Sequence, residues 1–379
     1  MKRALALTFI LTLLSLAIFV LLFLSLLTVV DVKADKNSWA TLAPMLTARA
    51  GFDAAVVDGR IYVIGGSSRV TEEYDPSTNT WATKTAIPTG RGGLVVATVQ
   101  NKVYAIGGYA DEYAWASLAI NEVYDPTTNS WVTKAEMPTA RGQMCANSVN
   151  DQIYVTGGLR IVGPASAEPC NKTEAYNPIT DTWVTKAEMP YAAVDHSSVV
   201  IGDKIYVLPS HISMYDTKFP IQIYDTKTDS WSLGSFPPTV QSNADAVTIL
   251  DEQGRELIYI FGGGGYGTYL DLVQIYNPQD DVWGVGDPMP TPRYGLAAVV
   301  VNNQIYALGG VAYGDGNLYG TMVSTNERYT PSESDFLLPT PTPTEEPQQK
   351  AQDMTAGAVF AATSIIVFLG LLVYLLKRK

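Results

Sequence analysis

Short apolar runs that end in a pair of small residues recur along the middle of the chain. They read IYVIGG, VYAIGG, IYVTGG, IYVLPS, IYIFGG and IYALGG, and they end at residues 66, 108, 158, 210, 263 and 310. Runs this short, rich in β-branched and aromatic residues, predict strands rather than helices. Their ends are 42, 50, 52, 53 and 47 residues apart, so each strand marks one unit of a repeat.

Each unit contains four such strands separated by turn signals. In the second unit they read LVVATV, KVYAIGG, NEVYDP and SWVTK, which predicts a four-stranded antiparallel sheet. The Asn-Lys and Asp-Gly pairs before the second strand are signals for tight hairpins. A sheet this small cannot bury both faces alone, so we expect the units to stack radially around a common centre.

A tyrosine and a tryptophan seven residues apart close five of the units. The tyrosine begins a Tyr-Asp-Pro or Tyr-Asn-Pro turn in most of them, which suits a type I turn. Two large side chains at a fixed offset offer surface for neighbouring sheets to bury. The pairs are Tyr74 and Trp81, Tyr124 and Trp131, Tyr176 and Trp183, Tyr224 and Trp231, and Tyr276 and Trp283.

On these motifs, residues 38 to 336 resemble the kelch family of β-propellers. The double glycine, the Tyr-Asp-Pro turn and the tryptophan seven residues on are the motif of that family. The fourth unit departs from it, with Pro209 and Ser210 in place of the glycines and Thr226 in place of the proline. The resemblance implies an all-β fold, a six-bladed kelch-type β-propeller, which we assign to residues 35–338.

The outer strand of the last blade has two candidates. Trp39 to Leu42 precedes the first unit, and Phe336 to Leu338 follows the last, with Phe336 seven residues after Tyr329. A ring must be closed, because an open one leaves exposed sheet edges. Arg49 follows Trp39 at the same offset that separates later tryptophans from arginines, which favours Trp39 to Leu42.

Both ends of the sequence are apolar. Ala4 to Val30 carries no charge and follows Met-Lys-Arg, so we expect residues 1–34 to be a signal peptide or signal anchor. Met354 to Leu376 is long enough for a transmembrane helix, and the basic residues 377–379 predict a cytoplasmic tail. The Pro/Thr-rich residues 339–353 predict an extended tether. The expected location is the cell membrane, single-pass, with the propeller on the extracytoplasmic side.

The charge and the scarcity of reactive residues exclude several classes of protein. Lys and Arg number 25 against 37 Asp and Glu, a net charge of −12, which disfavours a nucleic-acid partner. His196 and His211 are the only histidines, and no Cys/His cluster has the spacing of a metal site. No glycine-rich segment opens a helix to hold phosphate. We therefore predict no catalytic residue, no metal and no cofactor.

The start of each first strand and the loop after each double glycine are expected to meet at the mouth of the channel. An arginine recurs at that first-strand position, and Ala193 and Asn243 or a neighbour take its place in units four and five. In kelch domains that bind peptides, arginines of this element line the ligand pocket, so the resemblance implies the same role here. The alternative is that each arginine bonds loop carbonyls and holds blades together. The residues are Arg49, Arg91, Arg141 and Arg293.

The loops at the same mouth are expected to add further ligand-binding side chains. Aromatic groups around a concave mouth suit a sugar or a peptide, although loops packing on one another would use them equally well. The candidate acids there are Asp111, Glu112, Glu168 and Asp195. The candidate ligand-binding residues are Tyr109, Tyr113, Trp115, His211, Tyr266 and Tyr313.

Two cysteines, Cys145 and Cys170, lie in the first strand and the long loop of the third unit. An extracytoplasmic location permits a disulfide between them, and two free thiols are the alternative.

The expected function is a membrane-tethered extracellular binding or adhesion module, a protein-interaction propeller with a glycan or peptide ligand at the channel mouth. An arginine-lined mouth predicts an acidic ligand, because a guanidinium grips a carboxylate with two hydrogen bonds. The resemblance also leaves open an extracytoplasmic carbohydrate-active enzyme of the sialic-acid mutarotase type, which needs only acid/base and binding groups.

Overall fold

The computed structural model describes residues 39–66, 68–110, 116–163, 166–210, 219–251, 253–265, 267–314 and 317–331. The chain divides into a unit of residues 1–338 and a second unit of residues 339–379. The expected signal segment, tether, transmembrane helix and basic tail lie outside the described residues, as does Phe336. Within the described part, no helix is long and apolar enough to cross a membrane.

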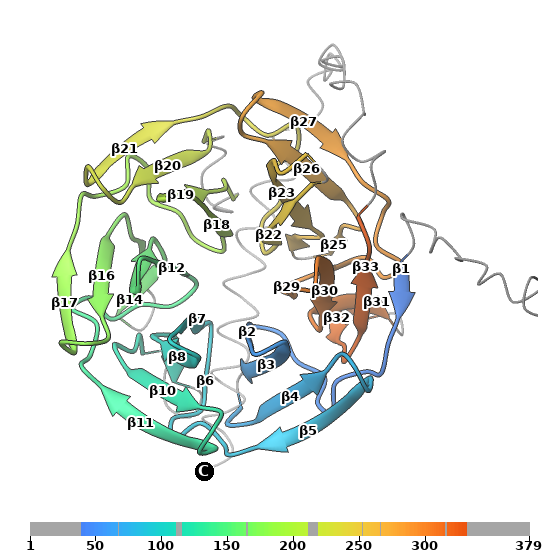
Figure 1. Cartoon of the computed structure of the whole chain (residues 1–379), viewed down its shortest axis with the longest axis horizontal. Helices are drawn as coiled ribbons and strands as arrows, with labels where there is room; N and C mark the ends of the chain where they lie inside the picture. Colours follow the sequence, from blue (N-terminus) through green and yellow to red (C-terminus); the bar gives the residue numbers. More distant parts are fainter. Residues whose placement is uncertain are drawn as a thin grey trace, which may run out of the picture. The chain divides into compact units, whose positions relative to one another are not determined.

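The described part is built of strands and contains no helix, which confirms the all-β prediction. Six of its sheets have four antiparallel strands each, and Figure 1 shows them arranged as a ring. The first three, from the inner strand outwards, are β2 (Phe52–Val57), β3 (Arg60–Gly65), β4 (Thr71–Asp75) and β5 (Thr80–Lys84); β7 (Val95–Val99), β8 (Lys102–Ile106), β10 (Asn121–Asp125) and β11 (Ser130–Lys134); and β12 (Cys145–Val149), β13 (Gln152–Thr156), β16 (Thr173–Asn177) and β17 (Thr182–Thr185).

The other three sheets follow the same order, except that the last takes its outer strand from the start of the described chain. They are β18 (Ser198–Ile201), β19 (Lys204–Val207), β20 (Gln222–Asp225) and β21 (Ser230–Leu233); β22 (Asp245–Leu250), β23 (Glu256–Phe261), β26 (Val273–Asn277) and β27 (Val282–Val285); and β29 (Ala297–Val301), β30 (Gln304–Leu308), β33 (Asn326–Tyr329) and β1 (Trp39–Thr41).

Shorter strands lie in the loops that follow the double glycines. They form the pairs β6 (Arg91–Gly92) with β9 (Tyr109–Ala110), β14 (Leu159–Gly163) with β15 (Ser166–Pro169), and β24 (Gly264–Gly265) with β25 (Thr268–Tyr269), and a sheet of β28 (Arg293–Tyr294), β31 (Val311–Gly314) and β32 (Asn317–Met322).

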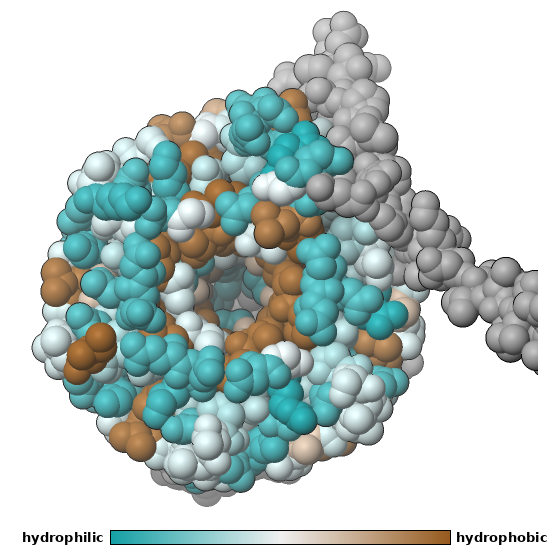
Figure 2. Space-filling view, in the orientation of Figure 1, coloured by the Kyte–Doolittle hydropathy of each residue, from teal (hydrophilic) through white to brown (hydrophobic). Residues whose placement is uncertain are grey.

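The six inner strands surround the centre of the ring. Each of β2, β7, β12, β18, β22 and β29 contacts the next, and β29 contacts β2. Figure 2 shows the face of the ring hollowed at its centre, with hydrophobic residues around the hollow. The radial stacking predicted from the repeat is therefore the observed arrangement.

Strand β1 confirms the first of the two closure alternatives. Trp39 pairs with Tyr329 across β1 and β33, and the amide of Leu42 donates to the carbonyl of Asn326 at 2.9 Å. The indole ring of Trp39 lies 5.0 Å from the ring of Tyr329 and 5.8 Å from that of Phe261. This aromatic packing explains why the strand occupies the edge of the last sheet.

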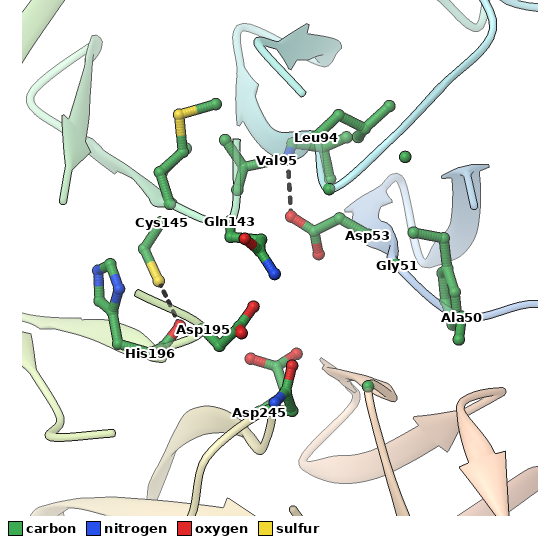
Figure 3. Close-up of a pocket in the computed structure, with 18 of the residues that line it drawn as sticks. Ala50, Gly51, Asp53, Leu94, Val95, Gln143, Cys145, Asp195, His196 and Asp245 are labelled. Carbon is green, nitrogen blue, oxygen red and sulfur yellow. Dashed lines mark hydrogen bonds between the residues drawn. The ribbon is translucent and has the colours of Figure 1, made fainter. Parts of the chain in front are cut away.

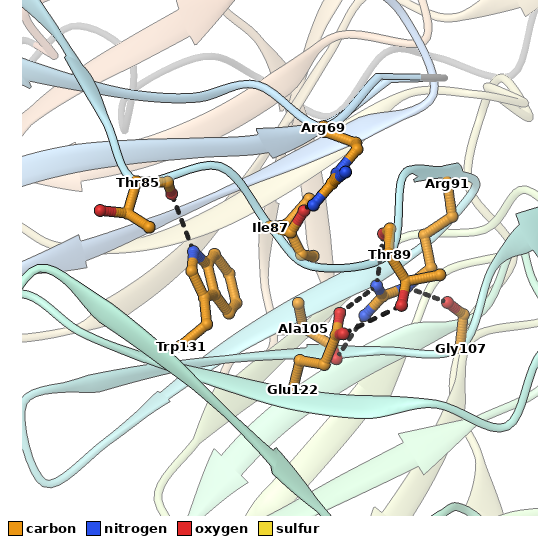
Figure 4. Close-up of polar contacts among 9 residues, drawn as sticks. All are labelled: Arg69, Thr85, Ile87, Thr89, Arg91, Ala105, Gly107, Glu122 and Trp131. Atoms are coloured by element: carbon orange, nitrogen blue, oxygen red, sulfur yellow. Dashed lines mark hydrogen bonds and ion pairs between the residues drawn. The ribbon is translucent and has the colours of Figure 1, made fainter.

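The Tyr and Trp motif joins each sheet to the one before it. The Tyr124 hydroxyl donates to Asn129 Oδ1 at 2.7 Å, and the same oxygen accepts the Thr85 amide at 3.0 Å. The indole N–H of Trp131 donates to the Thr85 carbonyl at 2.9 Å (Figure 4). Because corresponding bonds recur in other sheets, the motif fastens neighbouring sheets together as well as filling the space between them.

Candidate functional site

The four recurring arginines are buried, and each is paired with a buried glutamate. Arg91 donates to the carbonyls of Gly107, Thr89 and Ala105 at 2.8–2.9 Å and forms an ion pair with Glu122 at 2.5 Å (Figure 4). All four side chains are only 0–1% exposed. The equivalent pairs are Arg49 with Glu72, Arg141 with Glu174, and Arg293 with Glu327.

This arrangement corrects the prediction that the arginines line the ligand pocket. Each guanidinium neutralises a buried carboxylate and satisfies carbonyls of its own sheet, so Arg49, Arg91, Arg141 and Arg293 are braces. Their charge is already matched inside the protein. An acidic ligand gripped by them, as the sequence suggested, does not fit this geometry.

Units four and five replace the brace with neutral groups. Ala193 stands at the arginine position of unit four, and Gln241, rather than Asn243, stands at that of unit five. Gln241 donates to the carbonyl of Gly262 and accepts a bond from Gln274. Among the described residues, a buried glutamate is thus present only in the units that also carry an arginine to pair with it.

The two cysteines follow the second of the two alternatives. Cys145 and Cys170 are free thiols in separate surroundings. The Cys145 thiol faces the next sheet and donates to the carbonyl of His196 at 2.9 Å. Burial raises its pKa, so this thiol is a poor nucleophile at neutral pH.

A cavity of about 810 Å³ opens at the end of the channel where the inner strands begin. Its lining comes from the starts of the inner strands and from the loop strands β9 and β14, which is the mouth that the topology predicted. Tyr109 is one of its lining residues, as expected. None of the described residues that line it is a lysine or an arginine.

The rim of the channel is a ring of six corresponding residues, each in the left-handed backbone conformation. Their φ angles lie between +50° and +64°. Successive members are joined by backbone bonds, for example from the Gln143 amide to the Gly93 carbonyl at 2.9 Å and from the Asn243 amide to the Asp195 carbonyl at 3.0 Å. The members are Gly51, Gly93, Gln143, Asp195, Asn243 and Gly295.

The composition of this rim makes the cavity asymmetric. Polar side chains stand on the third, fourth and fifth sheets, and glycines stand on the sixth, first and second. A Cβ atom placed on Gly51 or Gly295 would meet nothing closer than 3.7 Å and 3.8 Å. Glycine adopts this positive φ angle without strain, and Gly51 and Gly295 also leave open space above their side of the cavity.

Three aspartates converge on the cavity in Figure 3, namely Asp53, Asp195 and Asp245. Asp53 is the second residue of β2, and its carboxylate accepts the amides of Ala54 and Val96, both at 2.7 Å. Asp245 in β22 accepts the amides of Ala246 and Ala298 in the same way, at 2.8 Å and 2.6 Å.

Burial makes these carboxyl groups weaker acids. Burial, with the nearby charge of Asp245 as a second cause, raises the pKa of Asp53 to about 8. Burial also raises the pKa of Asp195 and of Asp245 to about 6. Groups with these pKa values can exchange protons near neutral pH, and a cation placed among them would favour their charged forms.

Two further side chains complete the wall beside Asp195. The Tyr109 hydroxyl donates to the Leu159 carbonyl at 2.9 Å and to Gln143 Oε1 at 3.2 Å. His196 takes the place that Leu94 and Met144 hold in other units, and burial lowers its pKa to about 4. Its imidazole is therefore neutral and acts as packing between the third and fourth sheets.

Of the other residues predicted to bind a ligand, one is exposed on a loop strand and the rest lie outside the described residues. Tyr313 is 65% exposed beside Tyr269, in the loop strands above the last two sheets. Tyr113, Trp115, His211 and Tyr266 lie outside the described residues, as do Asp111 and Glu112. Sequence reasoning named Asp195 and missed Asp53 and Asp245, whose signal is an aspartate two residues after the rim position in GFD and NAD.

Comparisons with known proteins agree with this architecture. The family model of the KLHDC2/KLHL20/DRC7 Kelch-repeats domain matches residues 24–209. Kelch-like protein terF of Aspergillus terreus is 30% identical over 169 residues, which cover 41% of this chain and 36% of that protein. Human Kelch-like protein 23 is 26% identical over 165 residues, which cover 43% and 27%.

Two more comparisons extend the likeness. Beta-scruin of Limulus polyphemus is 26% identical over 151 residues, which cover 38% of this chain and 16% of that protein. The chain thus spans only about a sixth to a third of these relatives' length. The solved structure of YjhT superposes with a TM-score of 0.64 at 18% identity, covering 75% of this chain and 95% of that one, and this likeness concerns the fold alone.

Proposed function

We propose that this kelch-repeat β-propeller is a protein-binding module whose ligand enters the mouth of the channel. The observation that carries the proposal is the open cavity of about 810 Å³, lined by carboxylates that the blades leave unmatched by any lysine or arginine of the lining. A concave site on a rigid scaffold with a few placed polar groups is the usual form of a ligand site. The kelch-like relatives support a binding role.

The proposal includes a complete ring of six blades. Its support is the cyclic order of contacts among the six inner strands, with β29 against β2. Closing the last blade with β1 removes the free edge that strand β33 would otherwise present. A closed ring holds the rim residues at fixed positions, which lowers the cost of binding a ligand there.

The proposal also places the propeller on the extracytoplasmic side of the cell membrane, attached by the C-terminal helix. Its support is the sequence: two uncharged runs, residues 4–30 and 354–376, each flanked by basic residues on the side expected to stay inside. A protease added to intact cells is expected to remove the propeller and to leave the basic tail protected. Protection of the propeller would reverse the orientation.

A glycan ligand and an enzymatic role form the second candidate. The observation that favours it is the pair of aspartates, Asp53 and Asp195, whose pKa values of about 8 and about 6 suit acid and base roles at neutral pH. Such groups could interconvert sugar anomers, as the mutarotase-type alternative requires. The test is the rate of mutarotation of a sialic acid followed by proton NMR, with Asp195→Asn as the comparison. A rate equal to that without protein would reject it.

The main test is an array of random-sequence peptides and of glycans, probed with the purified full chain. We expect a discrete set of peptides to bind and Tyr294→Ala, which alters the cavity lining, to weaken that binding. Leu233→Ala, on the outer strand β21, is the matched control because its side chain is 49% exposed and lies away from the lining residues. Equal binding by both variants would place the ligand elsewhere.

A further inference from the structure

A ledge of three tyrosines leads from solvent to the cavity. Tyr294 lies in the lining, and its ring stacks on that of Tyr269 at 5.6 Å between centroids. The ring of Tyr269 meets that of Tyr313 edge-on at 6.0 Å, and Tyr313 is 65% exposed. The three rings come from separate loop strands, β28, β25 and β31, so the fold assembles an aromatic surface across the fifth and sixth sheets.

This ledge ends beside the open side of the rim. Tyr294 directly precedes Gly295, above which there is space for a ligand atom. Beyond the glycines lie Asp53 and Asp245, whose carboxylates face the cavity (Figure 3). The tyrosines therefore lie beside a part of the rim where a glycine leaves space, in the same cavity that these two aspartates face.

The charges around the cavity are unbalanced. Three carboxyl groups face it, of which Asp195 and Asp245, with pKa values of about 6, are mostly charged at neutral pH, and its described lining offers no lysine or arginine. The nearest arginines of the blades are each paired with a buried glutamate, so they do not compensate. Converging charges of one sign with low-dielectric walls focus the potential, and this cavity attracts cations.

We infer that the group bound in this cavity is a positively charged side chain, lysine or arginine, carried on a peptide and guided by the tyrosine ledge. The inference rests on the proposed function and names its ligand. Tyrosine rings attract ammonium and guanidinium groups through their faces, and they cover the aliphatic stem of either side chain. A cavity of about 810 Å³ exceeds one such side chain, so adjoining peptide backbone enters as well.

Electrostatic repulsion between the aspartates gives the cation a role that a neutral group cannot perform. The carboxylates of Asp53 and Asp245 are close enough for the charge of one to weaken the acidity of the other. A cation between them relieves that repulsion and allows charge-assisted hydrogen bonds. An acidic peptide would add to the repulsion, and the structure therefore selects against it.

The test starts from peptides that the full chain binds on a random-sequence array. In each, every lysine is replaced by norleucine and every arginine by citrulline, which keep the length and remove the charge. We expect one such replacement per peptide to weaken binding at least about tenfold. We expect Asp195→Asn to weaken the parent peptide to a similar degree and to leave the neutral version unaffected.

Asp58→Asn is the matched control for charge. Asp58 directly follows β2, the strand that contains Asp53. It is exposed in the hairpin turn and tolerates asparagine at its φ of 49°. This variant changes the net charge as Asp195→Asn does, so general attraction to an acidic protein would affect both equally. Equal losses in the two variants would overturn the inference. A melting temperature for each variant separates lost binding from lost folding, and Tyr313→Ala supplies an exposed second variant.

Different results would reject the proposed binding function and the cationic ligand. If no peptide binds more tightly to the wild type than to Tyr294→Ala, the proposed function fails. If peptides bind at the mouth but keep their affinity after the norleucine and citrulline replacements, or prove acidic, the proposed function stands and the cationic ligand is wrong.

Discussion

The third and fourth sheets differ in the side chains that occupy the same two buried positions. In the third, Arg141 bonds Glu174 and three backbone carbonyls, and a double glycine follows the second strand. In the fourth, Ala193 replaces the arginine, and Gln222 replaces the glutamate and bonds the backbone of Tyr191 through both ends of its amide. Features that recur from sheet to sheet hold the ring together, and features that break the recurrence mark where individual chemistry is placed.

The rim residues also divide into a structural group and a group that faces the cavity with polar side chains. Gly51, Gly93 and Gly295 meet only the backbone requirement of a positive φ angle, whereas Gln143, Asp195 and Asn243 meet it and also present polar groups to the cavity. The site therefore belongs to the less regular part of the ring. Each of the following predictions tests that division between bracing and binding.

The largest effect is expected from breaking a brace. Arg141→Ala leaves the buried carboxylate of Glu174 unpaired, so the free energy of unfolding should fall by about 3–5 kcal/mol. Combining it with Glu174→Gln copies the Ala193 and Gln222 arrangement and should recover about 2 kcal/mol of that loss. Denaturant unfolding followed by tryptophan fluorescence measures both.

Arg160→Ala serves as the control, because that side chain is 45% exposed and its ion pair to Glu168 is long, at 3.9 Å. Its stability should change by less than about 0.5 kcal/mol. A double variant no more stable than Arg141→Ala alone would mean that the arginine does not act by neutralising Glu174.

The second effect concerns His196, whose neutral imidazole packs between the third and fourth sheets. Its folded pKa of about 4 lies below the ordinary value of 6.5, so the unfolded chain binds a proton first as the pH falls. The stability that the neutral imidazole provides is complete above about pH 6.5 and is lost towards pH 4. The loss over that window should be about 3 kcal/mol.

His196→Leu copies the residue that the second and sixth sheets carry at this position, Leu94 and Leu296. The variant should lack this acid sensitivity, and the difference between the two unfolding free energies at pH 7 and pH 4 isolates it. Parallel pH curves for the two proteins would show that His196 is not buried in its neutral form.

A third and smaller effect is expected from Asp53→Asn. The folded pKa of about 8 lies above the ordinary value, so the stability that the protonated carboxyl provides is lost as the pH rises towards 8. At pH 9 the variant should be more stable than the wild type by at least about 1 kcal/mol, since asparagine keeps an acceptor for the Val96 amide and carries no charge. Thermal unfolding at pH 5 and pH 9 checks this, with Asp58→Asn unchanged at both. A variant less stable at pH 9 would show that both carboxylate bonds matter more than the repulsion.

The smallest stability effect is expected from Tyr313→Ala. Its ring is 65% exposed and makes an edge contact with Tyr269, so unfolding should change by less than about 0.5 kcal/mol. Binding of a lysine- or arginine-bearing peptide should still weaken several-fold, as titration calorimetry would show. Unchanged affinity would remove the ledge from the site and leave the carboxylates in it.

The sequence predicted the parts of this protein whose causes are local. Hydrophobic periodicity and turn chemistry act over a few residues, so they can be predicted from the sequence. They gave the strands and turns of each unit, the Tyr and Trp pair, and the N-terminal strand that pairs beside Tyr329. The prediction that the recurring arginines bind the ligand was wrong, because the repeat gives a residue's position and not its partner. These residues are Arg49, Arg91, Arg141 and Arg293. The buried glutamates that neutralise them stand on another strand, more than twenty residues further along the chain.

By itself, then, the sequence determined a ring of similar antiparallel sheets and the end of that ring where the variable loops gather. Only the tertiary structure decided which side chains face the cavity there. Asp53 and Asp245 are far apart in sequence and unremarkable in composition, and the ring brings their carboxylates close enough to raise the pKa of Asp53. Burial and proximity create that charge pattern, and neither exists until the ring brings the starts of the first and fifth sheets to one cavity.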